Sequence, residues 1–176
     1  ALISTEDSDE QSLIKKLLLS PGIVGIDLAK QVMTDKPYEW NKTGKYKVVV
    51  LDCGVKYNIL RELEKNNCIV KVLSANLSAD EIMKENPDGI LVSNGPGDPE
   101  GAMYVAKTIK QLIGKVPIFG ICFGHQLIGL ALGGKTYKLK FGHHGGNHPV
   151  KDLRTNKISI TSQNHNFCVD IDSLNK

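Results

Sequence analysis

Residues 116–126 read VPIFGICFGHQ, an apolar run that ends in a Gly-x-Cys-x-Gly turn and leads into a helix-like pattern over 124–132. A cysteine between a strand and a helix, with small residues two positions before and after it, is typical of a nucleophile elbow, because the tight turn leaves no room for larger side chains. Gly120 and Gly124 hold those two positions. Cys122 is therefore the candidate catalytic residue, and the N-terminus of the following helix is expected to favour its thiolate form.

Outward from this turn, apolar runs alternate with helical segments. The runs lie at 47–51, 69–73, 89–92 and 116–121, and the helical segments lie at 57–66, 78–85, 100–113 and 124–132. Such alternation predicts the α/β class, with a doubly wound, mostly parallel sheet that has helices on both faces. Beyond residue 132, shorter strands at 135–139, 157–161 and 167–170 are expected to pair antiparallel at one end of the sheet.

The first 45 residues have a different character. A short amphipathic helix is predicted at 6–19, where acids precede an apolar stripe, and the stretch from there to residue 45 is interpreted as a connecting arm. We therefore divide the chain into a helix and arm at 1–45 and a domain at 46–176. Because the chain starts without Met and ends soon after a strand, we expect it to be part of a longer protein. The arm would then link to a missing N-terminal domain, and the 46–176 domain would be incomplete at its C-terminus.

Composition argues against several classes of protein. With 22 Lys+Arg against 19 Asp+Glu, the net charge of +3 provides no concentrated basic surface for nucleic acid. Neither a membrane span of ~20 apolar residues nor a basic signal peptide is present, so no membrane partner is expected. The scattered cysteines argue against a zinc ribbon, and Cys53, Cys68 and Cys168 are expected to be small buried apolar residues. A cytoplasmic location is predicted, or an organellar one if a transit peptide precedes Ala1.

A second Gly-rich segment, SNGPGDP at residues 93–99, follows the apolar run at 89–92. Open α/β sheets bind ligands at the carboxyl ends of their strands, and glycines let backbone N–H groups approach a ligand closely. The N–H groups of Gly97 and Phe123 are therefore the candidate oxyanion hole.

Five segments together carry a resemblance to a known family: LDCGVKYNILREL, SNGPGDP, GICFGHQ, FGHHGGNHPVKD and SQNHNFCVD. In this order they resemble class I (triad) glutamine amidotransferases, and among these the small, glutamine-hydrolysing subunits of carbamoyl-phosphate synthetases. The resemblance runs from about residue 21 to the C-terminus. It implies a flavodoxin-like fold of the class I glutamine amidotransferase type.

The resemblance also implies an activity. Cys122 would attack the side-chain amide of glutamine, form a glutamyl thioester and release ammonia, and water would then free glutamate. The ammonia would pass to a large synthetase subunit that makes carbamoyl phosphate for arginine or pyrimidine biosynthesis, with ATP, Mg and bicarbonate bound on that subunit. No metal or cofactor is expected in this domain. The glutamine site carried over by motif position comprises Gly95, Gly97, Phe123, Gln126, Asn164, Asn166 and Phe167.

The sequence departs from the family pattern at three points. Phe123 and Asn166 stand where Leu and Gly are usual, but the first position acts through its backbone and Asn tolerates left-handed backbone at the second. The family's general base, a His followed two residues later by Glu, does not occur in residues 1–176. Because the reaction needs a base and an acid, this chain alone is expected to show low or no turnover.

The five histidines are interpreted as structural. His143, His144 and His148 lie in GHHGGNHP with no carboxylate or cysteine at ligand spacing, which favours a tight structural loop over a metal site. His125, one turn along the elbow helix, is expected to form a hydrogen bond in the packing rather than to act as the base. His165 is expected to support the pocket wall.

Two other functional hypotheses remain. One is a module that binds glutamine or docks to a synthetase without hydrolysis, which the missing His-x-Glu favours and the intact Cys122 opposes. The other is a relative with different chemistry, either a class I amidotransferase of the anthranilate or GMP synthesis type or a cysteine hydrolase for another amide. Related hydrolases carry a His beside the nucleophile, and Phe123 occupies that place here.

Overall fold

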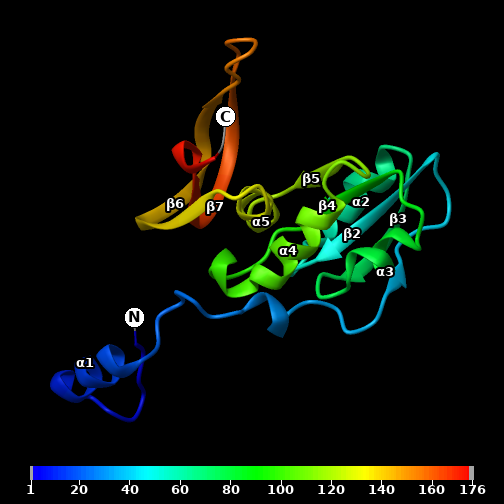
Figure 1. Ribbon diagram of the computed structural model, residues 1–176. Coiled ribbons are helices and arrows are strands. Elements are labelled where there is room, and N and C mark those ends of the chain that lie inside the picture. Colours follow the sequence, from blue (N-terminus) through cyan, green and yellow to red (C-terminus); the bar gives the residue numbers. More distant parts are fainter. Residues whose placement is uncertain (1, 175–176) are drawn as a thin grey trace.

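The computed structural model describes residues 2–174 and confirms the doubly wound α/β fold (Figure 1). A five-stranded sheet has the order β1-β3-β2-β4-β5. Its strands are β1 (Tyr38–Glu39), β2 (Tyr46–Asp52), β3 (Cys68–Ser74), β4 (Gly89–Val92) and β5 (Ile118–Gly120). All neighbouring strands run parallel except β1, which pairs antiparallel with β3. Because β3 and β4 flank β2 on opposite sides, the strand order reverses at β2, and such sheets bind ligands at this point.

Helices cover both faces of the sheet (Figure 1). The helical elements are α2 (Tyr57–Lys65) on one face and α3 (Ala79–Met83), η2 (Pro99–Ala102), α4 (Met103–Leu112) and α5 (Phe123–Ala131) on the other. Alternate residues of a strand point to opposite faces. Val50 of β2 therefore joins the apolar cluster of Leu60 in α2, whereas its neighbour Leu51 joins the cluster of Ile109 in α4.

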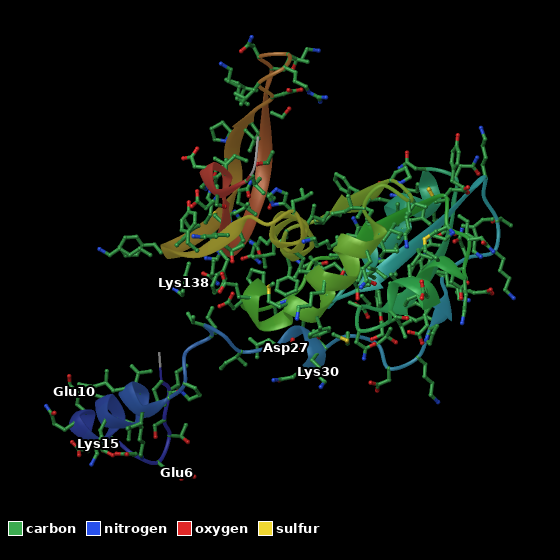
Figure 2. All side chains as sticks on the ribbon, viewed as in Figure 1. Glu6, Glu10, Lys15, Asp27, Lys30 and Lys138 are labelled. Atoms are coloured by element: carbon green, nitrogen blue, oxygen red, sulfur yellow. The ribbon has the colours of Figure 1, made fainter. Side chains whose placement is uncertain are left out.

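The N-terminal helix stands apart from the domain. α1 (Glu10–Leu19) starts later than predicted, because the Asp9 carboxylate accepts hydrogen bonds from two N–H groups of the first turn and caps the helix. No residue of α1 is buried. In Figures 1 and 2 the helix lies away from the sheet, with Glu10 and Lys15 on its surface.

The rest of the arm packs on the domain. η1 (Ala29–Gln31) and β1 both belong to it, and β1 adds a strand to the edge of the sheet. Ala29 is fully buried and Met33 is 9% exposed, and both lie in the main apolar cluster. The arm was not expected to supply core residues, because its apolar positions follow neither a helical nor a strand period.

The C-terminal strands form a separate sheet, which corrects the sequence-based expectation. β6 (Lys135–Lys151) and β7 (Ile158–Asp170) pair antiparallel with each other and not with the large sheet, and η3 (Ile171–Ser173) follows them. The GHHGGNHP segment is part of β6 rather than a tight loop. It is tolerated in a strand because the pairing shifts register on both sides of 143–145, and Gly142 and Gly145 take up positive φ there.

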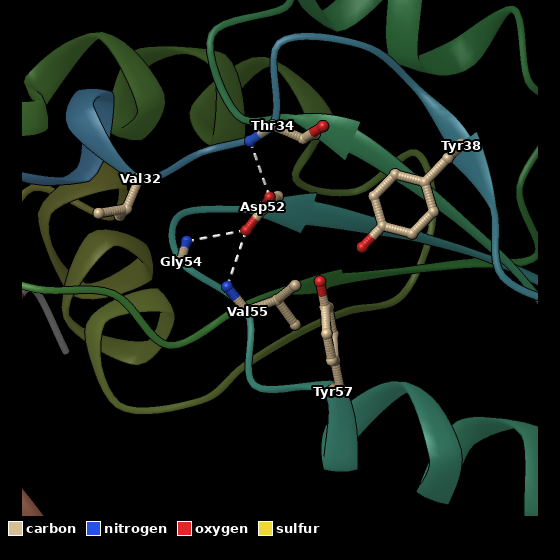
Figure 3. A pocket seen from close by; sticks show the side chains of 7 residues that line it. All are labelled: Val32, Thr34, Tyr38, Asp52, Gly54, Val55 and Tyr57. Atoms are coloured by element: carbon tan, nitrogen blue, oxygen red, sulfur yellow. Dashed lines mark hydrogen bonds between the residues drawn. The ribbon is translucent and has the colours of Figure 1, made fainter.

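Asp52, at the carboxyl end of β2, ties the arm to the loop that begins α2 (Figure 3). Its two carboxylate oxygens accept hydrogen bonds from the N–H groups of Thr34, Gly54 and Val55 at 2.7 to 2.8 Å. The side chain is buried, with 5% exposure. Three N–H donors therefore replace the water that a buried carboxylate loses.

Replacing Asp52 by Ala leaves these three N–H groups without an acceptor. We expect Asp52→Ala to lower the free energy of unfolding by about 2–4 kcal/mol, measured by urea denaturation. Asp52→Asn keeps one carbonyl oxygen and should cost clearly less. Equal losses in the two variants would contradict this account of Asp52.

Candidate active site

The turn between β5 and α5 has the geometry of a nucleophile elbow. Cys122 has φ 52° and ψ −107°, a strained conformation for a residue with a side chain. A Cβ on Gly120 would lie 2.5 Å from the backbone carbon of Gly124, and a Cβ on Gly124 would lie 2.1 Å from the carbonyl oxygen of Val92. Both glycines are therefore required by contact with backbone atoms, as the sequence predicted.

The loop after β4 lies beside this elbow. A Cβ on Gly95 would be 2.5 Å from the Cys53 carbonyl oxygen and 3.0 Å from a ring carbon of Phe123. Asn94 joins the same loop to the loop after β2, because its Oδ1 accepts from the Lys56 N–H at 3.0 Å and its Nδ2 donates to the Gly54 carbonyl at 2.9 Å. The carboxyl ends of β2, β4 and β5 thus meet at one place.

Residues of β7 complete the surroundings of Cys122. The Cys122 thiol donates to the backbone carbonyl of Asn164, with Sγ 3.7 Å from the oxygen. One turn into α5, the buried Gln126 side chain donates through Nε2 to the Phe167 carbonyl. Two predicted glutamine-site segments, far apart in sequence, therefore lie against each other.

Gly97 is less closely connected to the elbow. It has φ +85°, and a Cβ there would lie 3.1 to 3.2 Å from side-chain atoms of Leu28 in the arm. Its close neighbours are thus in the arm. Phe123 begins α5, where a helical N–H has no partner within the helix, and its N–H faces the Cys122 sulfur.

Burial raises the pKa of the Cys122 thiol above its ordinary value. The Phe123 N–H and the positive charge of Lys56 act in the opposite direction but do not outweigh burial. The N–H at the helix N-terminus thus favours the thiolate, as expected, but burial has the larger effect and the pKa is raised. The partly exposed Cys122 needs a base to become nucleophilic near neutral pH.

Three histidines of β6 and β7, His143, His148 and His165, lie in contact with one another. The ring of His143 lies between two others, with its Nδ1 3.2 Å from Nε2 of His165 and its Nε2 hydrogen-bonded to Nδ1 of His148. His165 also bonds to the Phe167 carbonyl at 2.9 Å, consistent with a supporting role. Within residues 2–174, no three His, Cys, Asp or Glu side chains are arranged to hold a metal ion.

His125 corrects a prediction. Its side chain is exposed on α5 and is therefore not part of the packed interior. Cys53 and Cys68 are buried and have free thiols, as expected. Cys168 is only partly buried, so the expectation of full burial is wrong for this residue.

Three residues of the site were not foreseen from the sequence: Asn94, Lys56 and His144. Each lies inside a segment that carries the family resemblance, which is the only signal that could have found them. His144 bonds to side chains of Asn164 and Asn166.

A pocket of about 300 Å³ lies at the carboxyl end of β2 and is not lined by the elbow residues. Figure 3 shows the hydroxyls of Tyr38 and Tyr57 directed into it, beside Asp52. Burial, with the Asp52 charge, raises the pKa of Tyr38. None of the predicted site residues lines this pocket.

Comparison with known proteins shows the family of this chain. The family model "Glutamine amidotransferase class-I" matches residues 49–176. The chain therefore belongs to the class-I glutamine amidotransferase family. A glutamine amidotransferase from Thermotoga maritima shares the fold, with a TM-score of 0.57 and 19% identity over 71% of this chain and 62% of that chain.

Within this family the chain is similar to carbamoyl phosphate synthase small chains, as the sequence motifs indicated. It is 49% identical to the chloroplastic small chain of Arabidopsis thaliana over 98% of this chain and 44% of that protein. It is 51% identical to the small chain of Chlorobaculum tepidum over 99% of this chain and 49% of that protein. The chain spans about half the length of these relatives.

Between residues 2 and 174, every helix falls short of the length and apolar character needed to cross a bilayer.

The contact between Gly124 and Val92 can be tested by stability. We expect Gly124→Ala to lower the free energy of unfolding by about 3 kcal/mol or more, because the Cβ meets a backbone carbonyl that cannot move aside. Gly146→Ala, where a Cβ would meet nothing within 4 Å, is the matched control and should change it by less than about 0.5 kcal/mol. Similar urea midpoints for the two variants would argue against the close crossing.

The raised pKa of Cys122 predicts how alkylation depends on pH. Only the thiolate reacts, so the rate with iodoacetamide should be slower than for free N-acetylcysteine near neutral pH and should still rise above about pH 9. Mass spectrometry after timed alkylation measures this rate at Cys122 itself. A plateau below about pH 8 would show that the thiolate is favoured after all.

Proposed function

We propose that this chain carries the glutamine-hydrolysing site of a carbamoyl phosphate synthase small subunit. The observation that carries the proposal is the contact of the Cys122 elbow with the β7 segment 164–167. The names of the similar small chains support the choice of this branch of the family. The glutamine pocket would be formed by Gly95, Gly97, Phe123, Gln126, Asn164, Asn166 and Phe167.

In the first half of the reaction, the Cys122 thiolate attacks the side-chain amide carbon of glutamine. The carbonyl oxygen becomes an oxyanion, and the N–H groups of Phe123 and Gly97 would stabilise it. The carbon–nitrogen bond then breaks, and the nitrogen leaves as ammonia after taking a proton. The product on the protein is a glutamyl thioester.

In the second half, water attacks the thioester. The carbon–sulfur bond breaks, glutamate leaves, and the sulfur recovers a proton. Both halves need a group that moves protons, since burial keeps Cys122 protonated near neutral pH. In the described residues, the hydrogen-bond partner of the Cys122 sulfur is the Asn164 carbonyl, which is no base. We therefore infer slow turnover by residues 1–176 alone.

The ammonia would be used by a large synthetase subunit, which would form carbamoyl phosphate from it for arginine or pyrimidine biosynthesis. The words "small chain" in the names of the relatives support such a partner. ATP, Mg and bicarbonate would bind to that subunit, and the chemistry on this chain would be that of the thiol.

The proposal is tested with a chloroketone analogue of L-glutamine, in which sulfur displaces chloride. We expect a single adduct on Cys122, detected by intact mass and peptide mapping. Saturating L-glutamine should slow labelling by about tenfold or more, whereas D-glutamine should not.

Cys122→Ser is the control and should give no adduct. Labelling spread over the four cysteines, or labelling that L-glutamine does not slow, would contradict the proposed function.

A further inference from the structure

His144 lies on the same face of the β6–β7 sheet as two asparagines of the proposed glutamine pocket. In the strand register it stands opposite Asn164. Its Nδ1 is 2.9 Å from Oδ1 of Asn164, and its Nε2 is 3.3 Å from Oδ1 of Asn166. Because residues two apart in a strand share a face, one ring spans both side chains. We call these three residues the asparagine clamp.

The backbone makes room for this arrangement at Gly142. A Cβ there would lie 2.2 Å from Nε2 of His144 and 2.6 Å from Oδ1 of Asn166. Gly142 also has φ +70°, a conformation that residues with side chains rarely adopt. The ring and the Asn166 amide therefore occupy space that only a glycine leaves free.

The asparagine clamp also touches the nucleophile through the backbone. The carbonyl of Asn164 accepts the hydrogen bond of the Cys122 thiol. Asn164 therefore contacts the sulfur through its backbone and His144 through its side chain. The other three β6–β7 histidines bond to one another and to different partners, so they do not substitute for His144.

An imidazole ring is suited to hold two asparagine side chains at once. Its two ring nitrogens face two amides, and each amide has a carbonyl oxygen and an NH₂ group on opposite sides. A ring nitrogen that carries a proton bonds to an amide oxygen, and one without a proton bonds to an NH₂ group. In the structure each ring nitrogen faces an Oδ1 atom, but a neutral ring donates to one oxygen only, so the other amide turns its NH₂ group to the unprotonated nitrogen. One asparagine then keeps its NH₂ group free for the carboxylate of a ligand, and the other keeps its oxygen free for an ammonium group.

We propose that His144 is a positioning residue for glutamine, which holds Asn164 and Asn166 in the orientation that binds the substrate. This inference rests on the proposed function. His144 is not proposed to exchange a proton with Cys122, because both of its ring nitrogens contact asparagine side chains.

The test compares His144→Ala, His144→Gln and the exposed control His125→Ala in this chain. The first readout is the L-glutamine concentration that halves labelling of Cys122 by the chloroketone analogue. The second is the rate at which Cys122 reacts with methyl methanethiosulfonate, which has no amino acid groups to recognise. The third is the urea midpoint of unfolding.

We expect His144→Ala to raise the half-protecting concentration about fivefold, with the methanethiosulfonate rate and the urea midpoint unchanged. His144→Gln should recover most of the protection, because its amide has an NH₂ donor group and an oxygen acceptor, as a neutral imidazole has one donor and one acceptor nitrogen. His125→Ala should match the unaltered chain.

Unchanged protection in His144→Ala, with the unaltered chain protected normally, would overturn the positioning role alone. Equal loss in the Ala and Gln variants together with lower urea midpoints would overturn it in favour of a purely structural role. If L-glutamine does not slow labelling of the unaltered chain, the proposed function is wrong. The positioning role of His144 is then wrong as well, because it rests on that function.

Discussion

The close crossing of α5 over the end of β4 is the constraint on which the site depends. Gly124 approaches the Val92 carbonyl so closely that even a Cβ would overlap it, and this leaves only a very short turn after β5. Cys122 must then adopt positive φ, at a cost of about 1–3 kcal/mol. The same turn puts the sulfur at the carboxyl edge of the sheet, where the loop after β4 and the β7 strand reach it.

The surroundings of Cys122 hold its sulfur at the carboxyl edge of the sheet but favour the protonated thiol, which is a poor nucleophile. Burial raises the pKa of the thiol, and neither the Phe123 N–H nor the charge of Lys56 compensates fully. A nucleophile of this kind can remain unreactive until a base accepts its proton. Its hydrogen-bond acceptor in the described residues is instead the backbone carbonyl of Asn164, which cannot take up the proton.

Much of the central sheet was predictable, because buried parallel strands are almost continuously apolar. The glycines around Cys122 were predictable as well, because a tight strand-to-helix turn has no room for larger side chains. The separate β6–β7 sheet was not, since its Gly- and His-rich segment shows no strand period and is held by pairing across many residues. The core role of Ala29 and the net pKa of Cys122 depend on tertiary burial, which local sequence does not reveal. The resemblance covers His144, but the contacts of the asparagine clamp depend on the strand register, which pairs His144 with Asn164.

The central claim is that the elbow and β7 form one glutamine pocket in this chain, and NMR tests it most directly. In a ¹⁵N-labelled Cys122→Ser chain titrated with L-glutamine, the backbone amide of Phe123 and the side-chain amides of Gln126 and Asn164 should shift together, with one dissociation constant. D-Glutamine should leave them in place. No shift at these groups, or shifts confined to the pocket beside Tyr38 and Tyr57, would contradict the account.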